Sequence, residues 1–254
     1  MNGKSAKEHE PIEAYEPGPP WLPGFIQGPF LYLSIYQEGA EKRLLSCMEE
    51  VLLQHGWREP PLEPPPPVPR EEWETSLYWC RGPIPGAGTV RGALESAGTL
   101  SPDLYPDPDL VRFWVSAENH HIASSFPQDR DAVARALSVS RYMLHLLHTV
   151  CSSTDFLYGG IAQEYYVPGP REMRDRLSTG PSLGCIAMSR AHYSETALSR
   201  MAELYNGRVR YEASYVFYED PGELDPRAEW LKPSRGDAEE IMRILLSPID
   251  LAGV

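Results

Sequence analysis

Histidines are the side chains of this sequence best suited to proton transfer, because their ordinary pKa lies close to neutrality. The stretch Glu118-Asn119-His120-His121 directly follows a predicted strand at residues 110–117, and catalytic side chains often gather where strands end. His120 and His121 are therefore the strongest candidates for catalysis. The next acids after the histidines, Asp129 and Asp131, open a predicted helix whose N-terminal dipole already accounts for them. The two histidines thus have no evident catalytic partner.

A second histidine pair, His145 and His148, is spaced so that both side chains lie on one face of a predicted helix at residues 129–151. Arg141 falls on the same face and would repel a bound cation. The pattern therefore favours a solvated or partner-facing stripe of this helix over a metal site.

Motifs for cofactor binding and hydrolysis are missing. Residues 86–92 contain a Gly-x-Gly, but the third glycine comes one place late for the dinucleotide fingerprint. The sequence has no Walker phosphate loop and no Gly-x-Ser-x-Gly nucleophile elbow. Four cysteines lack the paired spacing of a zinc site, and we expect them to be reduced and mostly buried: Cys47, Cys80, Cys151 and Cys185. We expect no cofactor, no metal and no catalytic residues.

An acidic region with interleaved aromatic residues lies near the C-terminus. Between residues 212 and 240, nine acids stand against three Lys and Arg residues, a local charge of −6. Aromatic anchors surrounded by carboxylates suit an electrostatically steered interface with a basic protein. Six residues are the predicted contacts with such a partner: Tyr218, Glu219, Asp220, Glu223, Asp225 and Trp230.

The elements that must position these residues do not follow a regular strand–helix alternation. Apolar and aromatic runs predict strands at residues 30–36, 75–80, 110–117, 156–162, 183–188, 209–211 and 214–218. Helical periodicity predicts helices at residues 38–55, 129–151, 170–177, 193–205 and 236–246, and a long loop at 82–108. This order predicts an α+β fold, with a mixed, largely antiparallel sheet and packed helices, rather than a doubly wound nucleotide-binding fold.

Proline usage divides the chain, because 18 of the 26 prolines precede Asp109. Residues 1–28 show no periodic apolar face and are predicted to form a proline-rich, irregular tail. Residues 60–69 are predicted to be an extended polyproline connector. We expect residues 29–254 to form a single α+β domain, with two subdomains at 29–118 and 119–254 as the alternative.

Composition limits the classes of partner. With 254 residues, 42% of them hydrophobic, the chain can bury a sizeable core. Its net charge of −13 and its lack of a basic run argue against binding to nucleic acid through a basic surface. No apolar stretch reaches the length of about 20 residues that crosses a bilayer, and residues 1–10 contain no apolar leader. We expect a cytoplasmic protein with no nucleic-acid or membrane partner.

Three parts of the chain carry a resemblance to a known family. They are the opening strand and helix at residues 30–57, the stretch at 155–164 followed by 167–173, and the late strand that ends at Tyr218. In this arrangement the sequence resembles the immunity protein 52 family of bacterial polymorphic-toxin and type VI secretion systems. The resemblance implies a cytoplasmic antitoxin that binds a restriction-endonuclease-like toxin domain and carries no catalytic residues.

We therefore expect an immunity protein that neutralises a cognate secreted bacterial toxin, a basic nuclease, by occluding its active site. Two alternatives stay open at this point. One is an adaptor or structural protein of a phage or secretion system, and the other is an enzyme that uses His120 or His121. The genes next to its own would discriminate between the three.

Overall fold

The computed structural model describes residues 30–58, 78–96, 107–116, 130–163, 167–176, 184–225, 227–229, 231 and 234–252. Three of the sequence-based expectations lie outside these residues: the irregular tail at 1–28, the polyproline connector at 60–69, and the histidine pair His120 and His121. The boundary between tail and domain also falls there.

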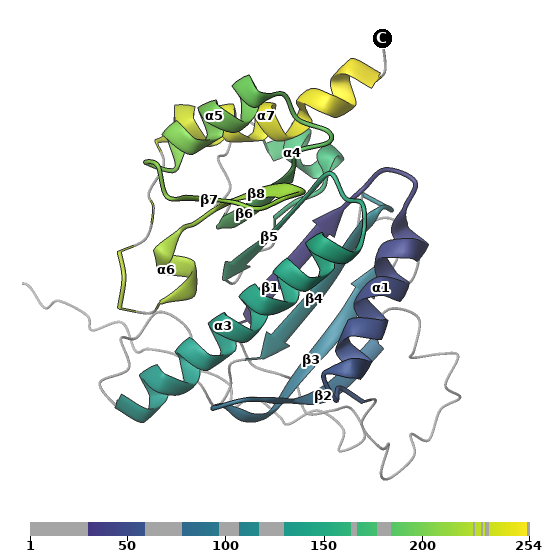
Figure 1. The fold of residues 1–254 in the computed structure, drawn as a ribbon, viewed down its shortest axis with the longest axis vertical. Helices are drawn as coiled ribbons and strands as arrows, with labels where there is room; N and C mark the ends of the chain where they lie inside the picture. Colours follow the sequence, from purple (N-terminus) through teal and green to yellow (C-terminus); the bar gives the residue numbers. More distant parts are fainter. Residues whose placement is uncertain are drawn as a thin grey trace, which may run out of the picture.

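Eight strands form one sheet (Figure 1). They are β1 (Phe30–Tyr36), β2 (Tyr78–Ile84), β3 (Gly88–Ser96), β4 (Leu110–Ser116), β5 (Tyr158–Gln163), β6 (Cys185–Ser189), β7 (Val209–Tyr211) and β8 (Tyr215–Tyr218). Their order in the sheet is β2-β3-β4-β1-β5-β6-β8-β7. Each neighbouring pair is antiparallel, so the predicted α+β class is confirmed and the sheet of the described residues has no parallel pair.

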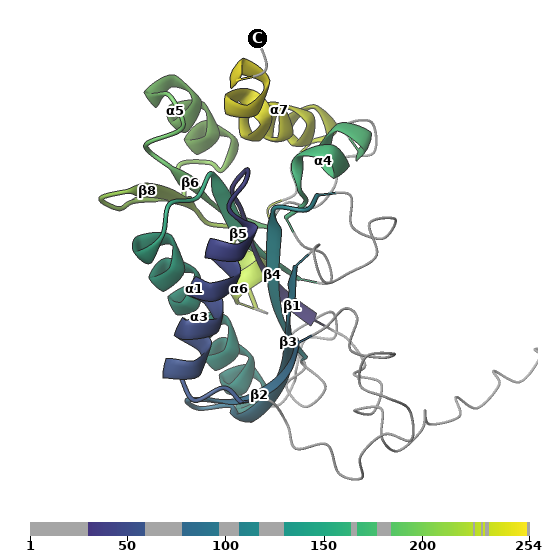
Figure 2. The ribbon, with the colours of Figure 1, turned by 90° about the vertical axis from the view of Figure 1, so that its right-hand side faces the viewer.

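Helices cover both faces of this sheet. In the described residues they are α1 (Glu41–Gln54), α3 (Arg130–Ser153), α4 (Pro170–Arg176), α5 (Glu195–Leu204), α6 (Pro221–Leu224) and α7 (Arg235–Ala252). Figure 2 shows α1 and α3 on the same side of the central strands, and α5 and α7 lie together at the β6–β8 end of the sheet. No helix among the described residues is both long and apolar enough to span a membrane.

Two hydrophobic clusters hold these layers together. The larger cluster joins α1 and α3 to alternate residues of the strands, such as Leu33 and Phe217. The smaller cluster joins α5 and α7 to the strand residues that face the opposite side of the sheet, such as Tyr158 and Tyr218. Strands β5, β6 and β8 are buried on both faces, which is why their sequences are continuous apolar runs rather than alternating ones.

One strand of the sheet was missed by the sequence pattern. The loop predicted at residues 82–108 contains β3 and the end of β2. Glycines weaken the strand signal here, but the packing requires them. A Cβ on Gly92 would lie 2.5 Å from the carbonyl oxygen of Trp114 on the neighbouring strand. Pro83 is compatible with β2 because β2 is an edge strand of the sheet.

The long helix α3 buries half of the stripe that its periodicity predicts, which is Val133, Leu137, Ser140, Leu144, Leu147 and Val150. Ser140, Leu147 and Val150 are buried, whereas Val133, Leu137 and Leu144 are only partly buried. The fully buried stripe instead runs through Ala136 and Val139 and continues towards the helix C-terminus. Small alanine side chains let the helix backbone approach the sheet closely, so the buried face follows side-chain size as well as hydrophobicity.

Two further differences concern the C-terminal third. The four-residue helix α6 was not predicted, and α7 continues through Pro248 to Ala252 instead of ending before the proline. Beyond Pro248, the Asp250 carboxylate accepts a hydrogen bond of 2.7 Å from the guanidinium of Arg174 on α4. This ion pair attaches the last part of α7 to the neighbouring helix. The expected state of the cysteines is confirmed: all four are free and three are fully buried.

Trp57 locks α1 and α3 to the edge of the sheet. Its indole Nε1 donates a hydrogen bond of 2.5 Å to the hydroxyl of Tyr142 on α3, and its ring packs edge-on against Phe113 with centroids 5.0 Å apart. The ring is 1% exposed and occupies the space above Gly82. A Cβ at Gly82 would lie 2.2 Å from the ring, so only glycine fits there.

Replacing Gly82 with Ala should lower the free energy of unfolding by about 1–3 kcal/mol, because Trp57 has no room to move. Urea denaturation followed by circular dichroism measures this change. The matched control is Gly236→Ala at the start of α7, where the closest atom to a new Cβ is 3.9 Å away. That control should leave stability unchanged or raise it by up to about 1 kcal/mol. Equal effects of the two variants would contradict the packing assigned to Trp57.

Candidate functional site

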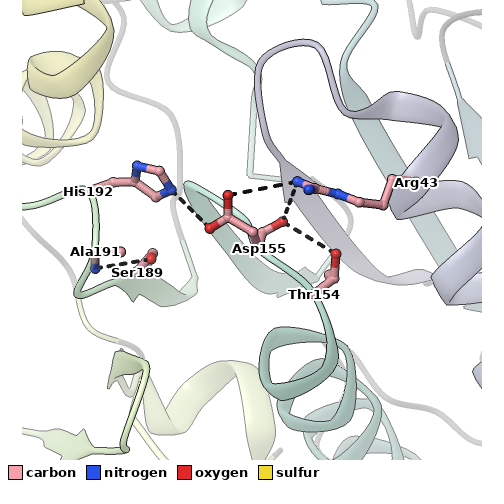
Figure 3. Close-up of polar contacts among 6 residues, drawn as sticks. All are labelled: Arg43, Thr154, Asp155, Ser189, Ala191 and His192. Atoms are coloured by element: carbon pink, nitrogen blue, oxygen red, sulfur yellow. Dashed lines mark hydrogen bonds and ion pairs between the residues drawn. The ribbon is translucent and has the colours of Figure 1, made fainter.

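Three connections meet at one end of the sheet and form the candidate site (Figure 3). Asp155 lies between α3 and β5, Arg43 lies in the first turn of α1, and His192 lies between β6 and α5. The three residues come together because β1, β5 and β6 are neighbours in the sheet. Consequently, the connections at their ends are also neighbours.

Asp155 is the centre of this group. Its Oδ1 lies 3.0 Å from Nε2 of His192, and its Oδ2 lies 3.8 Å from Nη2 of Arg43. The same guanidinium nitrogen donates a hydrogen bond of 3.2 Å to the backbone carbonyl of Asp155. The Asp155 side chain is 49% exposed, and exposed ion pairs of this kind are worth about 1 kcal/mol or less. An incoming charged group can therefore compete for the carboxylate.

Two open hollows adjoin at Asp155. The first has a volume of about 600 Å³ and is formed by residues 37–43 together with Asp109 and Asp155. The second has a volume of about 460 Å³ and runs along residues 151–156 and 189–191 to Ala213 and Ser214. We call the two hollows together the Asp155 groove. It crosses the ends of several elements and is open to solvent.

The first hollow is electronegative. Its lining has four carboxylates, Glu38, Glu41, Asp109 and Asp155, against the two cations Lys42 and Arg43, which leaves a net charge of −2. The phenol of Tyr36 at the end of β1 responds to this field. Burial, followed by the carboxylates of Asp109 and Glu38, raises the pKa of Tyr36 well above its ordinary value.

A serine, a histidine and an aspartate near the groove have the residue types of a hydrolase triad, but their geometry is different. The Oγ of Ser189 accepts a hydrogen bond of 3.3 Å from the backbone N–H of Ala191, and the serine is 4% exposed. The imidazole of His192 contacts Asp155 and has no hydrogen bond to the Ser189 hydroxyl in the described part of the chain, whereas the backbone N–H of His192 donates to the carbonyl of Ser189 at 3.4 Å. The arrangement lacks the nucleophile–base contact that such chemistry needs.

The described residues contain no group of three or more His, Cys, Asp or Glu side chains arranged to hold a metal ion. His145 is exposed, as expected for a solvated stripe, but His148 is only half-exposed. Its Nδ1 contacts the hydroxyl of Tyr215, and its ring packs against Phe217 at 5.2 Å. His148 is therefore part of the packing between α3 and the sheet.

Three of the predicted contact residues are in the interior. Tyr218, Asp220 and Glu223 are between 0% and 3% exposed. The hydroxyl of Tyr218 donates a hydrogen bond of 2.9 Å to the carbonyl of Leu198, so this tyrosine anchors α5 to the sheet. The predicted partner contact at Tyr218 does not fit this position, because its side chain is buried in the hydrophobic cluster of α5 and α7.

Asp220 has a structural role. Its Oδ1 accepts hydrogen bonds of 2.9 Å from the backbone N–H groups of Gly222 and Leu231, which caps α6 and fixes the segment that follows it. Its backbone carbonyl and N–H also lie 3.3 Å from the Sγ of Cys185 on β6. The carboxylate is therefore occupied within the fold rather than directed at a partner.

Glu223 is buried beneath α3 and β5 with little to stabilise a charge. Neither carboxylate oxygen meets a hydrogen-bond partner at normal geometry, and the backbone N–H of Gln163 compensates only weakly. Burial, followed by repulsion from Asp220, raises the pKa of Glu223 well above its ordinary value. A carboxyl group in such a place favours its protonated form.

The other predicted contacts lie closer to the surface. Glu219 and Asp225 are partly exposed, whereas Trp230 lies outside the described residues. Asp225 forms a two-point ion pair with Arg227, with distances of 2.9 and 2.7 Å, and these hydrogen bonds lower its pKa. The charge of Asp225 is thus balanced locally.

The remaining acids of the C-terminal region show the same tendency. Asp237 exchanges hydrogen bonds with Ser234 at the start of α7, and Glu240 binds Arg200 on α5 at 2.7 Å. Glu239 lies within 3.4 Å of two arginines of its own helix. Within the described residues, six of the nine acids are therefore buried or bonded to other parts of the fold: Asp220, Glu223, Asp225, Asp237, Glu239 and Glu240.

Comparisons with known proteins give a fold likeness. No protein-family model matches the sequence, and no curated protein matches it. Among solved structures, the fold has a distant similarity to the Pseudomonas aeruginosa T6SS protein PA0821, with a TM-score of 0.36 and 12% sequence identity. The match covers 87% of this chain and 73% of that chain.

Replacing Glu223 with Gln should raise the free energy of unfolding at neutral pH, because the Gln side chain carries no charge that has to be buried. The folded protein holds the Glu223 proton more tightly than the unfolded chain does. The contribution of the protonated Glu223 to the free energy of unfolding is therefore fully present below the unfolded-state pKa, about 4.3. This contribution is lost as the pH rises through the folded-state pKa.

Denaturation midpoints measured from pH 4 to pH 8 test this, and the Gln variant should show a flatter profile than the natural protein. Glu229→Gln is the control, since Glu229 is exposed. A Glu223→Gln variant with the same pH profile as the natural protein would show that the buried carboxyl does not titrate as described.

Proposed function

We propose that this protein is an immunity protein, a stoichiometric binder that neutralises a cognate secreted bacterial toxin by occluding its active site. The Asp155 groove is the contact surface in this proposal. The observation that carries it is the junction of two wide, open hollows at an exposed carboxylate.

The shape of the groove favours a protein partner over a small molecule. Sites for small molecules are mostly concave, enclosed and apolar, with a few placed polar groups. The two hollows here have volumes of about 600 and 460 Å³ and are open to solvent. The first is lined mainly by polar surface, and the second by polar and apolar surface together. A loop of a second protein fits such a surface better than a buried ligand does.

The charge of the groove favours a basic partner. A nuclease must hold phosphates with Lys and Arg side chains. Carboxylates such as Glu38, Asp109 and Asp155 can replace those phosphates, and the whole chain carries a net charge of −13. Opposite net charges accelerate the encounter of two proteins, and packing at the contact then sets how long the complex lasts.

The resemblance to the immunity protein 52 family supports the same class of function. Its motifs include residues 155–164, and the first of these, Asp155, is the residue that joins the two hollows. In this proposal the protein acts by binding alone. The cytoplasm is the compartment that follows, because a producing cell must neutralise its toxin before secretion.

Reversing the charge of the groove should weaken toxin binding. We expect Glu38→Arg and Asp155→Arg each to raise the Kd for the toxin domain encoded by the adjacent gene by about tenfold or more, which is about 1.4 kcal/mol. Most of the loss should appear in the association rate, together with a weaker dependence on salt. Surface plasmon resonance at several salt concentrations measures both.

The matched control is Glu50→Arg, an exposed acid near the other end of α1. It makes the same charge change outside the groove and should bind with nearly the natural association rate. The proposed function is wrong if the product of the adjacent gene does not bind the natural protein and does not kill cells from which the natural protein has been removed. If binding occurs but the groove variants behave like the Glu50 control, the contact surface is wrong.

A further inference from the structure

The outer edge of β7 is unpaired in the described residues. The backbone N–H of Glu212 donates to the carbonyl of Tyr215, and that of Glu219 donates to the carbonyl of Arg208. Because hydrogen-bonded pairs alternate along an antiparallel ladder, Arg208, Arg210 and Glu212 direct their backbone groups towards β8. Val209 and Tyr211 therefore direct their N–H and carbonyl groups outward.

The opposite edge of the sheet is partly closed by the chain itself. Arg58 forms a bridge with Arg81 on the outer side of β2, with two backbone hydrogen bonds of 2.8 Å. No such cover lies over Val209 or Tyr211 in the described part of the molecule. In the described residues, the chain therefore covers part of the β2 edge and leaves the β7 edge open.

The two faces of β7 carry different kinds of side chain, charged on one face and apolar or aromatic on the other. Arg210 lies over the ring of Phe217 at 4.9 Å, on the α3 side of the sheet. Val209 and Tyr211 lie on the other side, where Val209 packs with the α5 and α7 cluster. Tyr211 is 61% exposed, and Leu53 is the other large hydrophobic side chain of the described residues that is exposed.

We propose that the outer edge of β7 is a docking site for an extended segment of the partner toxin, which adds to the sheet as a further strand. This inference rests on the proposed function. Backbone hydrogen bonds to Val209 and Tyr211 provide the attachment, and side-chain pairs provide the selectivity. The segment that fits has apolar residues beside Val209 and Tyr211, and charged residues beside Arg210 and Glu212.

A second copy of this chain fits the edge poorly. Antiparallel pairing of β7 with itself about a two-fold axis at the middle of the strand places Arg210 directly opposite Arg210 of the other copy. Like charges directly opposite each other destabilise a strand pair. Each copy also carries a net charge of −13, which adds to the repulsion. A different protein with positive charge avoids both costs.

The edge is continuous with the Asp155 groove. The turn after β7 includes Ala213 and Ser214, and both line the second hollow. A segment paired along Val209 and Tyr211 reaches this turn at the C-terminal end of β7. The same partner can therefore contact the edge and the groove in one continuous interface.

Proline substitution tests the edge without removing a side-chain anchor. Val209→Pro deletes the outward N–H, whereas the bonds to β8 come from Arg208, Arg210 and Glu212. We expect Val209→Pro to raise the Kd for the adjacent-gene toxin domain at least about tenfold, and Val209→Ala to change it by less than about threefold. Tyr211→Ala should mainly speed dissociation. Thermal unfolding checks that each variant folds.

Hydrogen exchange of the natural protein gives a second measurement that does not depend on a variant. The amides of Val209 and Tyr211 should exchange quickly in the free protein and slowly in the complex with the toxin domain. Unchanged exchange in a complex that still protects cells would overturn the edge site and leave the proposed function standing. Slower exchange of these amides without toxin as the protein concentration rises, with a doubled mass in sedimentation, would assign the edge to a second copy instead.

Discussion

Strand β1 pairs with β4 on one side and with β5 on the other, and the arrangement of the molecule depends on this double pairing. It joins strands from the first half of the chain to strands from the second half in one antiparallel sheet. Glycines in β5 allow close approach on both of its sides. A Cβ on Gly159 would lie 2.9 Å from the carbonyl oxygen of Ser34 on β1, and a Cβ on Gly160 would lie 2.3 Å from that of Cys185 on β6. With β1 and β6 both close to β5, the connections at their ends are brought together.

The position of Asp155 follows from that constraint. Arg43 is 112 residues away in sequence and His192 is 37 residues away, yet both reach its carboxylate. His192 lies on a short connection and Arg43 in the first turn of α1, and a buried strand or helix fixes the direction of each. The groove is thus held by rigid elements, while the side chains in it stay exposed and can exchange partners. In the proposed function, such a surface binds a second protein through charge without reorganising the core.

The C-terminal acids show how one fold can use the same residue type for different purposes. Asp220 caps a helix, Glu223 is buried without a good partner, and Glu240 joins α5 to α7 through Arg200. A high local charge in the sequence is therefore a poor measure of a charged surface. What matters is which carboxylates the strand and helix directions leave facing solvent.

Local patterns in the sequence were sufficient to identify much of the fold. The apolar run of residues 30–36 coincides with β1, and the α+β class, the free cysteines and the positions of α3 and α5 were also predicted. These features depend on near neighbours in the chain, because hydrophobic periodicity, helix caps and cysteine spacing are local properties. They could therefore be read without knowing the sheet order.

Other features were decided only by the tertiary structure. Strand β3 escaped prediction because its glycines are required by atoms of Trp57 and Trp114, which are distant in sequence. Tyr218 suggested an exposed anchor, but β8 lies between β6 and β7 and is buried on both faces. Asp155 begins the stretch at residues 155–164 that carries the family resemblance, but it belongs to no catalytic or metal-binding motif. Only the sheet order places it beside Arg43 and His192, because contacts between distant residues leave no periodic signal in the chain.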